Sequence, residues 1–290
     1  MVRSKHKITG ERVLDWVIYL ILFLLIIIFV VPLLYVLSAS VTPYSELIRR
    51  GGFVIVPSEL SFDAYKELFS TSLIGSAFKN TLFVTIAGTA INMVLSILFA
   101  YPLSKKSLPG VKFLTLMLVF TMMFNGGTIP TYFVVKDTGL LNSLWALIIP
   151  GAIAQYNVIL LKNYFQSMPD ELFEAATIDG AGAFRVLLSI AVPLAKPIIM
   201  TVMLLYMVGN WNVFYAGILY INSNELKPLQ VVLREILMSS QNMLNNVDTH
   251  APSLTMRMAA IVVTSVPIIM VYPFVQRYFI KGIMVGAVKG

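Results

Sequence analysis

Six stretches of about 20 residues contain no charged side chain, and they restrict this chain to a fold that crosses a membrane. In chain order they are residues 17–39, 81–103, 113–135, 143–161, 198–220 and 258–276. A polypeptide inside hydrocarbon must satisfy its own backbone hydrogen bonds, which a helix of about 20 residues does. The chain is also 58% hydrophobic and only 12% charged, unlike a soluble domain. We therefore predict an all-α, multi-pass membrane protein with six transmembrane helices.

The first and third of these stretches depart from a simple span. The first follows several basic residues, as a secretory signal would, but its run of 23 apolar residues is longer than the about 7–15 of a signal peptide. We interpret it as an uncleaved first span. The third contains Phe124–Pro130 (FNGGTIP), whose glycines and proline predict a break near the outer end of the helix.

The positive charges predict how the chain is oriented. If the N-terminus lies in the cytoplasm, the cytoplasmic segments hold all of the formal net charge of +7, and the outer segments hold equal numbers of cations and anions. Cytoplasmic loops usually carry the excess of Lys and Arg. We therefore predict a cell-membrane protein with both termini in the cytoplasm. The positive charge then reflects topology and not binding to nucleic acid.

Motifs for catalysis are absent from the sequence. It has no G-x-x-x-x-G-K-[ST] phosphate loop, no H-E-x-x-H zinc motif and no G-x-S-x-G nucleophile motif. It has no cysteine, and its two histidines, His6 and His250, lie far apart in the sequence. The apolar stretches also lack the ionisable groups that ion-coupled carriers use. These features predict a protein that is not an enzyme, holds no metal or cofactor, and takes its energy from a partner.

A polar segment, residues 171–197, separates the fourth and fifth apolar stretches. Ser167 is expected to cap its first helix, with Pro169 in the first turn. Asp179-Gly180 is expected to end that helix, because glycine adopts the left-handed conformation without a Cβ penalty. A second short helix is expected over residues 184–190. The segment thus predicts two short helices joined by a sharp bend with small residues.

This segment resembles the coupling loop of ABC-importer permeases. The family signature is E-A-A, three residues, G, nine residues, then I-x-x-P, and Glu174-Ala175-Ala176, Gly180, Ile190 and Pro193 match it in register. The resemblance implies that residues 167–197 lie in the cytoplasm and sit in a groove of an ATP-hydrolysing subunit. It implies that the residues in contact with this ATPase are Glu171, Glu174, Ala175, Ala176, Asp179, Gly180 and Ala181. The alternative is an amphipathic helix at the membrane surface without a partner.

Further segments resemble the carbohydrate class of these permeases. GNWNVFYAGILYIN at 209–222 and the C-terminal Arg277-Tyr278-Phe279 carry this likeness. FNGGTIPTYFVV, LLNSLWALIIPGAI and YNVILLKNYFQSMP resemble a subgroup from Gram-positive bacteria that imports oligosaccharides, often fragments of polysaccharides. The resemblance implies a type I ABC-importer permease fold, a second homologous permease subunit, two ATP-binding subunits that bind the ATP, and an extracellular sugar-binding protein.

The same resemblance predicts how the chain is divided. Residues 1–75 are expected to form the cytoplasmic N-terminus, the first transmembrane helix and an extracellular loop. Residues 76–280 are expected to form a core of five helices that contains the coupling loop. Residues 281–290 are expected to form a cytoplasmic tail, whose last part, 285–290, points toward the ATPase dimer in this family.

Neutral polar residues within the apolar stretches are candidates for a substrate path. Amides and aromatic rings suit hydroxyl-rich neutral solutes, and Asn210, Trp211 and Asn212 group together, with Tyr215 and Asn157 as further candidates. The alternative is that such residues hydrogen-bond between helices. The interpretation is an oligosaccharide permease that works by alternating access. The alternatives are a permease for a polyol, a glycerol phosphate ester or a peptide, and a membrane assembly subunit without a path.

Overall fold

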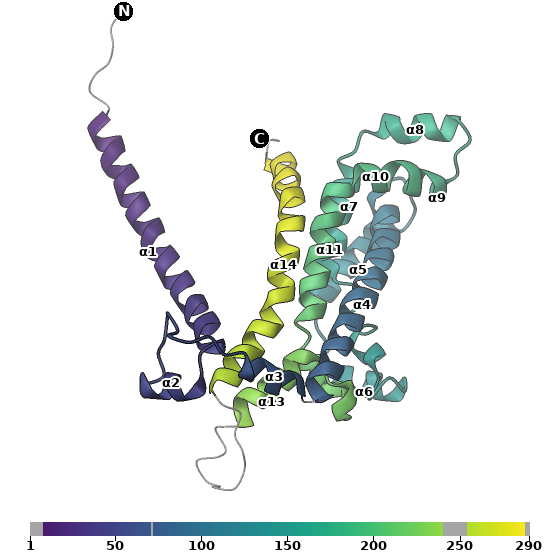
Figure 1. The fold of residues 1–290 in the computed structure, drawn as a ribbon. Coiled ribbons are helices and arrows are strands. Elements are labelled where there is room, and N and C mark those ends of the chain that lie inside the picture. Colours follow the sequence, from purple (N-terminus) through teal and green to yellow (C-terminus); the bar gives the residue numbers. More distant parts are fainter. Residues whose placement is uncertain (1–7, 71, 240–253, 288–290) are drawn as a thin grey trace, which may run out of the picture. The chain divides into compact units, whose positions relative to one another are not determined.

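A computed structural model describes residues 8–70, 72–239 and 254–287 of the chain (Figure 1). Within these residues every regular element is a helix and there is no strand, which confirms the all-α prediction. His6, His250 and the last three residues of the predicted tail lie outside the described part.

The helices are as follows: α1 Ile8–Ser40, α2 Tyr44–Arg49, α3 Asp63–Ser70, α4 Ser72–Ser104, α5 Val111–Met123, α6 Thr128–Asp137, α7 Gln155–Gln166, α8 Asp170–Ile178, α9 Ala183–Val186, α10 Val192–Leu194, α11 Lys196–Trp211, α12 Tyr215–Tyr220, α13 Leu229–Ser239 and α14 Leu254–Ala287. Short 3-10 turns form at Leu144–Leu147 and Asn224–Leu226, and a π-helical turn forms at Leu187–Ala191. The chain forms two compact units, Met1–Thr71 with Ile236–Val263, and Ser72–Glu235 with Thr264–Gly290.

Three helices of the described part are long and apolar enough to cross a membrane, in α1, α4 and α14. Two bent pairs raise this number to five if each pair is one span. One pair is α5 and α6, which meet at 114° across residues 124–127, and this confirms the predicted break. In the other pair the segment 183–194 meets α11 at 84°. The described helices therefore do not give the predicted count of six.

The expectation of a continuous fourth helix over residues 143–161 was wrong. The chain is not helical between residues 149 and 154, and α7 has only 12 residues, a length of about 18 Å. Side chains of neighbouring helices satisfy this irregular backbone. Asn92 donates to the carbonyl of Ala152 at 2.7 Å, and the Tyr206 hydroxyl accepts from the amide of Ala154 at 3.0 Å. Such backbone persists in a membrane only where protein or water satisfies it.

In the second unit, α4 packs against both α7 and α11. The buried apolar side chains between these helices include Ala100, Val158, Leu161 and Val202. Polar bonds join the same helices, and one of them links the Ser96 and Tyr206 hydroxyls at 2.6 Å. Figure 1 shows α8 lying across the end of this bundle.

The first unit holds a buried acid in the loop region after α1. The Glu46 side chain is 5% exposed, forms an ion pair with Arg50 at 3.0 Å and accepts from the Ser58 amide at 3.0 Å. This amide, and the nearby Arg50 charge, hold the pKa of the Glu46 carboxyl below its ordinary value. The bonds tie α2 to residues 56–58 of the loop.

Candidate functional site

The first helix of the candidate coupling loop, α8, ends as predicted. Gly180 has a φ of +80°, in the left-handed region. The amide of Gly180 donates to the carbonyl of Thr177 at 3.0 Å, and the amide of Ala181 donates to the carbonyl of Ala176 at 2.9 Å. These two bonds form a Schellman motif, which satisfies carbonyls at the helix end. The prediction for the end of this helix is confirmed.

The expected start of α8 was wrong by two residues. Pro169 occupies the N-cap position and offers no side-chain bond to the helix. The hydroxyl of Ser167 instead donates to the carbonyl of Tyr164 at 2.8 Å, so this serine closes the end of α7. Ser167 and Pro169 belong to the short connection between two helices, and the sequence pattern assigned the serine to the wrong one.

Most side chains of the loop face away from the rest of the chain. Glu171, Glu174 and Asp179 are exposed, and so are the apolar side chains of Ile178 (86%) and Phe184 (64%). A Cβ built on Gly180 or Gly182 would meet no atom within 4 Å in the described structure. The bend therefore presents acidic and apolar groups on an open surface, which suits a partner protein with basic and apolar groups.

Phe173 is the one buried residue of α8. The ammonium group of Lys105, just after α4, lies 3.4 Å from the centroid of the Phe173 ring and 5.5 Å from that of Tyr101. Burial lowers the pKa of Lys105, and the charge of Asp170 acts in the opposite direction. This contact lies outside the apolar stretches, at the end of α4 where the loop meets the bundle.

Two of the proposed path residues make packing contacts between helices. The Asn210 amide donates to Asn92 Oδ1 at 2.9 Å and to Thr89 Oγ1 at 3.2 Å. Trp211 is only 4% exposed, donates from Nε1 to the carbonyl of Thr264 at 3.0 Å, and meets the Phe78 ring edge to face. These contacts hold α4, α11 and α14 together, as the helix-packing alternative requires.

The other three path candidates lie in different surroundings. Asn212 is exposed, and its Oδ1 accepts from Gln230 at 3.2 Å. Tyr215 is 61% exposed, and its hydroxyl lies 3.4 Å from that of Thr128. Asn157 is buried on α7. The structure therefore does not bring the five residues to one place within this chain, and their role in a path stays a prediction.

One exposed residue near Phe214, Arg234, could not be predicted from the sequence pattern. The Arg234 guanidinium lies 5.2 Å from the Phe214 ring, one helical turn beyond Gln230 on α13. Asn212 and Phe214 thus both contact α13, the first through Gln230 and the second through Arg234. The sequence holds no signal that α13 meets residues 212 and 214, which lie about 20 residues earlier in the chain.

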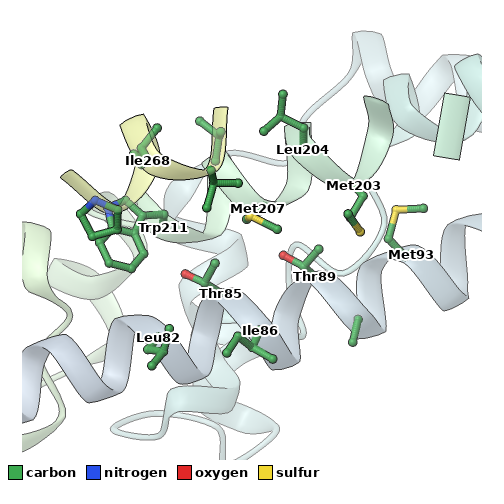
Figure 2. Close-up of a pocket in the computed structure, with 14 residues that line it drawn as sticks. Leu82, Thr85, Ile86, Thr89, Met93, Met203, Leu204, Met207, Trp211 and Ile268 are labelled. Carbon is green, nitrogen blue, oxygen red and sulfur yellow. The ribbon is translucent and has the colours of Figure 1, made fainter. Parts of the chain in front are cut away.

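A cavity of about 480 Å³ lies between α4, α11 and α14 (Figure 2). Its lining is almost wholly apolar, with Met93, Met203, Met207 and Ile268 prominent. Its two hydroxyls are used within the chain, since Thr85 donates to the carbonyl of Thr81 and Thr89 accepts from Asn210. The lining therefore offers little to bind a sugar. In the described residues, no three His, Cys, Asp or Glu side chains are placed to hold a metal ion.

Comparison with known proteins gives the family. The family model described as "Binding-protein-dependent transport system inner membrane component" matches residues 106–285, more than half of the chain. The chain is 42% identical over 285 residues to the polygalacturonan/rhamnogalacturonan transport system permease protein YtcP of Bacillus subtilis (strain 168), covering 97% of this chain and 99% of that protein. It is 41% identical over 293 residues to Protein LplC of the same organism, covering 100% and 99%.

A solved structure supports the same assignment. A chain from a bacterial ABC transporter involved in the import of the acidic polysaccharide alginate superposes with a TM-score of 0.86 at 30% identity, covering 93% of this chain and 98% of that chain. The fold is therefore that of a type I ABC-importer permease, embedded in the membrane and crossing it several times. This chain belongs to the family of inner-membrane components of binding-protein-dependent transport systems.

Proposed function

We propose that this chain is the permease subunit of an ATP-driven importer that moves polysaccharide-derived oligosaccharides into the cytoplasm. The observation that carries this proposal is the likeness to the alginate importer over nearly the whole chain. An extracellular solute-binding protein delivers the sugar, and the permease opens alternately to the two sides of the membrane. The family supports transport and not catalysis, so the chemistry of ATP hydrolysis belongs to other subunits.

The proposed partners follow from the resemblance to ABC-importer permeases, and the loop offers a surface for one of them. We propose a heterodimer with a second homologous permease and two ATP-binding subunits, one of which receives residues 167–197. Glu171, Glu174, Ala175, Ala176, Asp179, Gly180 and Ala181 are the proposed contacts. Their support is the family signature together with the exposure of the acidic and apolar side chains around the bend. The chain itself needs no cofactor in this proposal.

The substrate class is drawn from the two named relatives. Polygalacturonan and alginate are acidic polysaccharides, so we propose that this chain passes oligosaccharides that contain uronic acids. The path would lie between the two permeases. Of the path candidates, Asn212 and Tyr215 are exposed and would face the solute, while Asn210, Trp211 and Asn157 would support the path by packing within the bundle.

The test is ATP hydrolysis by the complex purified in lipid with its partners. We expect the binding protein to stimulate hydrolysis several-fold when it is loaded with an oligogalacturonide, and little when it is empty. An uncharged oligosaccharide, a glycerol phosphate ester and a peptide serve as the other arms. If only one of these three solutes stimulated hydrolysis, that solute and not an acidic oligosaccharide would be the substrate class. A complex without any stimulated hydrolysis would instead favour the assembly subunit.

Single cysteines test the proposed orientation. The native chain has no cysteine, so each variant carries one label site. In intact cells an impermeant maleimide should label Ser223→Cys on the outer side, and should leave Ser107→Cys and Ser189→Cys unlabelled until the cells are opened, because the excess positive charge marks the inner side. Labelling of Ser107→Cys but not Ser223→Cys in intact cells would reverse the topology and remove the loop from the cytoplasm.

A further inference from the structure

The coupling helix α8 meets the bundle mainly through one aromatic ring. Phe173 is its one buried residue, and Ala176 is partly buried in the same cluster. The Phe173 ring meets the Tyr101 ring on α4 at 6.4 Å, and Tyr101 meets Phe165 on α7 at 5.6 Å. The remaining side chains of α8 face outward or toward open space. Apart from the chain connections at its two ends, this ring is the main attachment of α8.

Two clefts flank the attachment. One, of about 690 Å³, is lined by Ser104, Gln166 and Glu174, and the other, of about 660 Å³, by Pro102, Phe184 and Leu187. Lys105 and Phe173 line both clefts. With these clefts beside it, α8 itself meets α4 through Phe173, Tyr101 and Lys105. The next part of the loop reaches the same core separately, through the buried side chains of Val186 and Leu187.

Lys105 is well suited to hold this ring. A cation over an aromatic face is attracted by the ring quadrupole, and the attraction grows when the cation is withdrawn from water. The separation of 3.4 Å is short, and Lys105 is half-buried. Among the described residues Lys105 forms no ion pair, although Asp170 lies near enough for its charge to be felt. The ring face is therefore the closest partner of its charge.

The helix on the other side of the contact reaches across the whole unit. α4 has 33 residues without a break, a length of about 50 Å. Along this length it bonds to α11 through Thr89, Asn92 and Ser96, and it lines the apolar cavity. A displacement at its cytoplasmic end would therefore be carried to the helices that surround a central path.

We propose that Lys105 is a positioning residue of the transport cycle, which clamps Phe173 against Tyr101 so that α8 and α4 move as one body. The inference rests on the proposed function, in which an ATPase moves α8. Lys105 does not touch the ATPase in this account. It determines how much of the movement of α8 reaches the membrane-spanning helices.

The test compares variants of Lys105 in the whole purified complex. In Lys105→Gln the charge is lost and the length is nearly kept, while Lys105→Arg retains a cation that binds an aromatic face. Lys106→Gln is the matched control, because Lys106 is exposed and has no ring contact in the described structure. The readouts are co-purification of the ATPase, basal hydrolysis, and the stimulation of hydrolysis by oligogalacturonide-loaded binding protein.

Lys105→Gln is expected to retain the ATPase and the basal hydrolysis. The stimulation of hydrolysis by the loaded binding protein should fall about three- to ten-fold, because one partly buried cation–π contact changes an equilibrium constant by about this factor. Lys105→Arg should recover most of the stimulation, and Lys106→Gln should match the wild type. Phe173→Leu should resemble Lys105→Gln, and the double variant should be no worse than either, because both remove one contact.

Two results would overturn the inference. Lys105→Gln could match Lys106→Gln, in which case the contact transmits nothing. Alternatively it could release the ATPase, in which case Lys105 is a docking residue. Both results leave a wild-type complex that responds to the sugar. If the wild-type complex itself shows no stimulation, the proposed function fails, so the two failures are distinguishable.

Discussion

Gly180→Val is expected to leave the protein inserted in the membrane but to release the ATPase and abolish transport. The residue has a φ of +80°, and a left-handed conformation costs a residue with a Cβ about 1–2 kcal/mol, with the higher value for a branched side chain. Valine would therefore break the Schellman motif that ends α8 and redirect residues 181–183. No transmembrane helix includes this position, so insertion should be unchanged.

Two other variants separate backbone strain from added bulk. Gly182 has a φ of −66°, and a Cβ there also meets no atom within 4 Å of this chain. Gly182→Ala should therefore fold normally, and any loss of ATPase binding would report a close partner surface. Gly180→Asn should be milder than Gly180→Val, since asparagine tolerates the left-handed region. The measurement is the amount of ATPase that co-purifies with each permease variant. Normal ATPase binding and uptake in Gly180→Val would show that the bend is not the coupling element.

Trp211→Ala is expected to destabilise the bundle and not to act selectively on transport. The side chain is buried, lies between α4, α11 and α14, and borders the apolar cavity (Figure 2). Its loss would enlarge this cavity and leave the Thr264 carbonyl without the indole donor. Truncation of a buried tryptophan costs about 3–5 kcal/mol, and we expect the lower end because the surrounding lipid is itself apolar.

The measurement is the thermal stability of the detergent-purified permease complex, followed by its yield. Asn212→Ala is the matched control, because Asn212 is the exposed neighbour and should lose uptake without a loss of stability if it faces the sugar. A Trp211→Ala complex with wild-type stability and a selective loss of uptake would contradict this expectation and place Trp211 in the substrate path.

The features that could be predicted from the sequence are those set by residues close together in the chain. The end of α8 and the break between α5 and α6 depend on glycine conformations within a few residues, so they could be predicted. The irregular stretch before α7 could not, because its bonds come from Asn92 and Tyr206, which are far away in the sequence. The apolar pattern of a sequence does not show whether a run forms a helix or an irregular segment held by neighbouring helices.

In the candidate site too, features of one short segment could be predicted, whereas contacts between distant segments could not. The family signature located the loop and its exposed acids, which are properties of one short segment. The role of Trp211 depends on Thr264 and Phe78, and the contact of Lys105 with Phe173 joins the end of α4 to α8, 68 residues later in the sequence. In the sequence, Lys105 is only one of two neighbouring lysines, Lys105 and Lys106. Tertiary contacts of this kind have no periodic pattern from which they could be predicted.

The most direct test of the central claim is ATP-dependent accumulation of a labelled oligogalacturonide in vesicles that contain the complete complex and its binding protein. We expect accumulation against a concentration gradient with the wild-type chain, and none with Gly180→Val, without ATP or without the binding protein. Accumulation that persists in Gly180→Val, or that needs no ATP, would contradict the claim that residues 167–197 couple this permease to an ATPase.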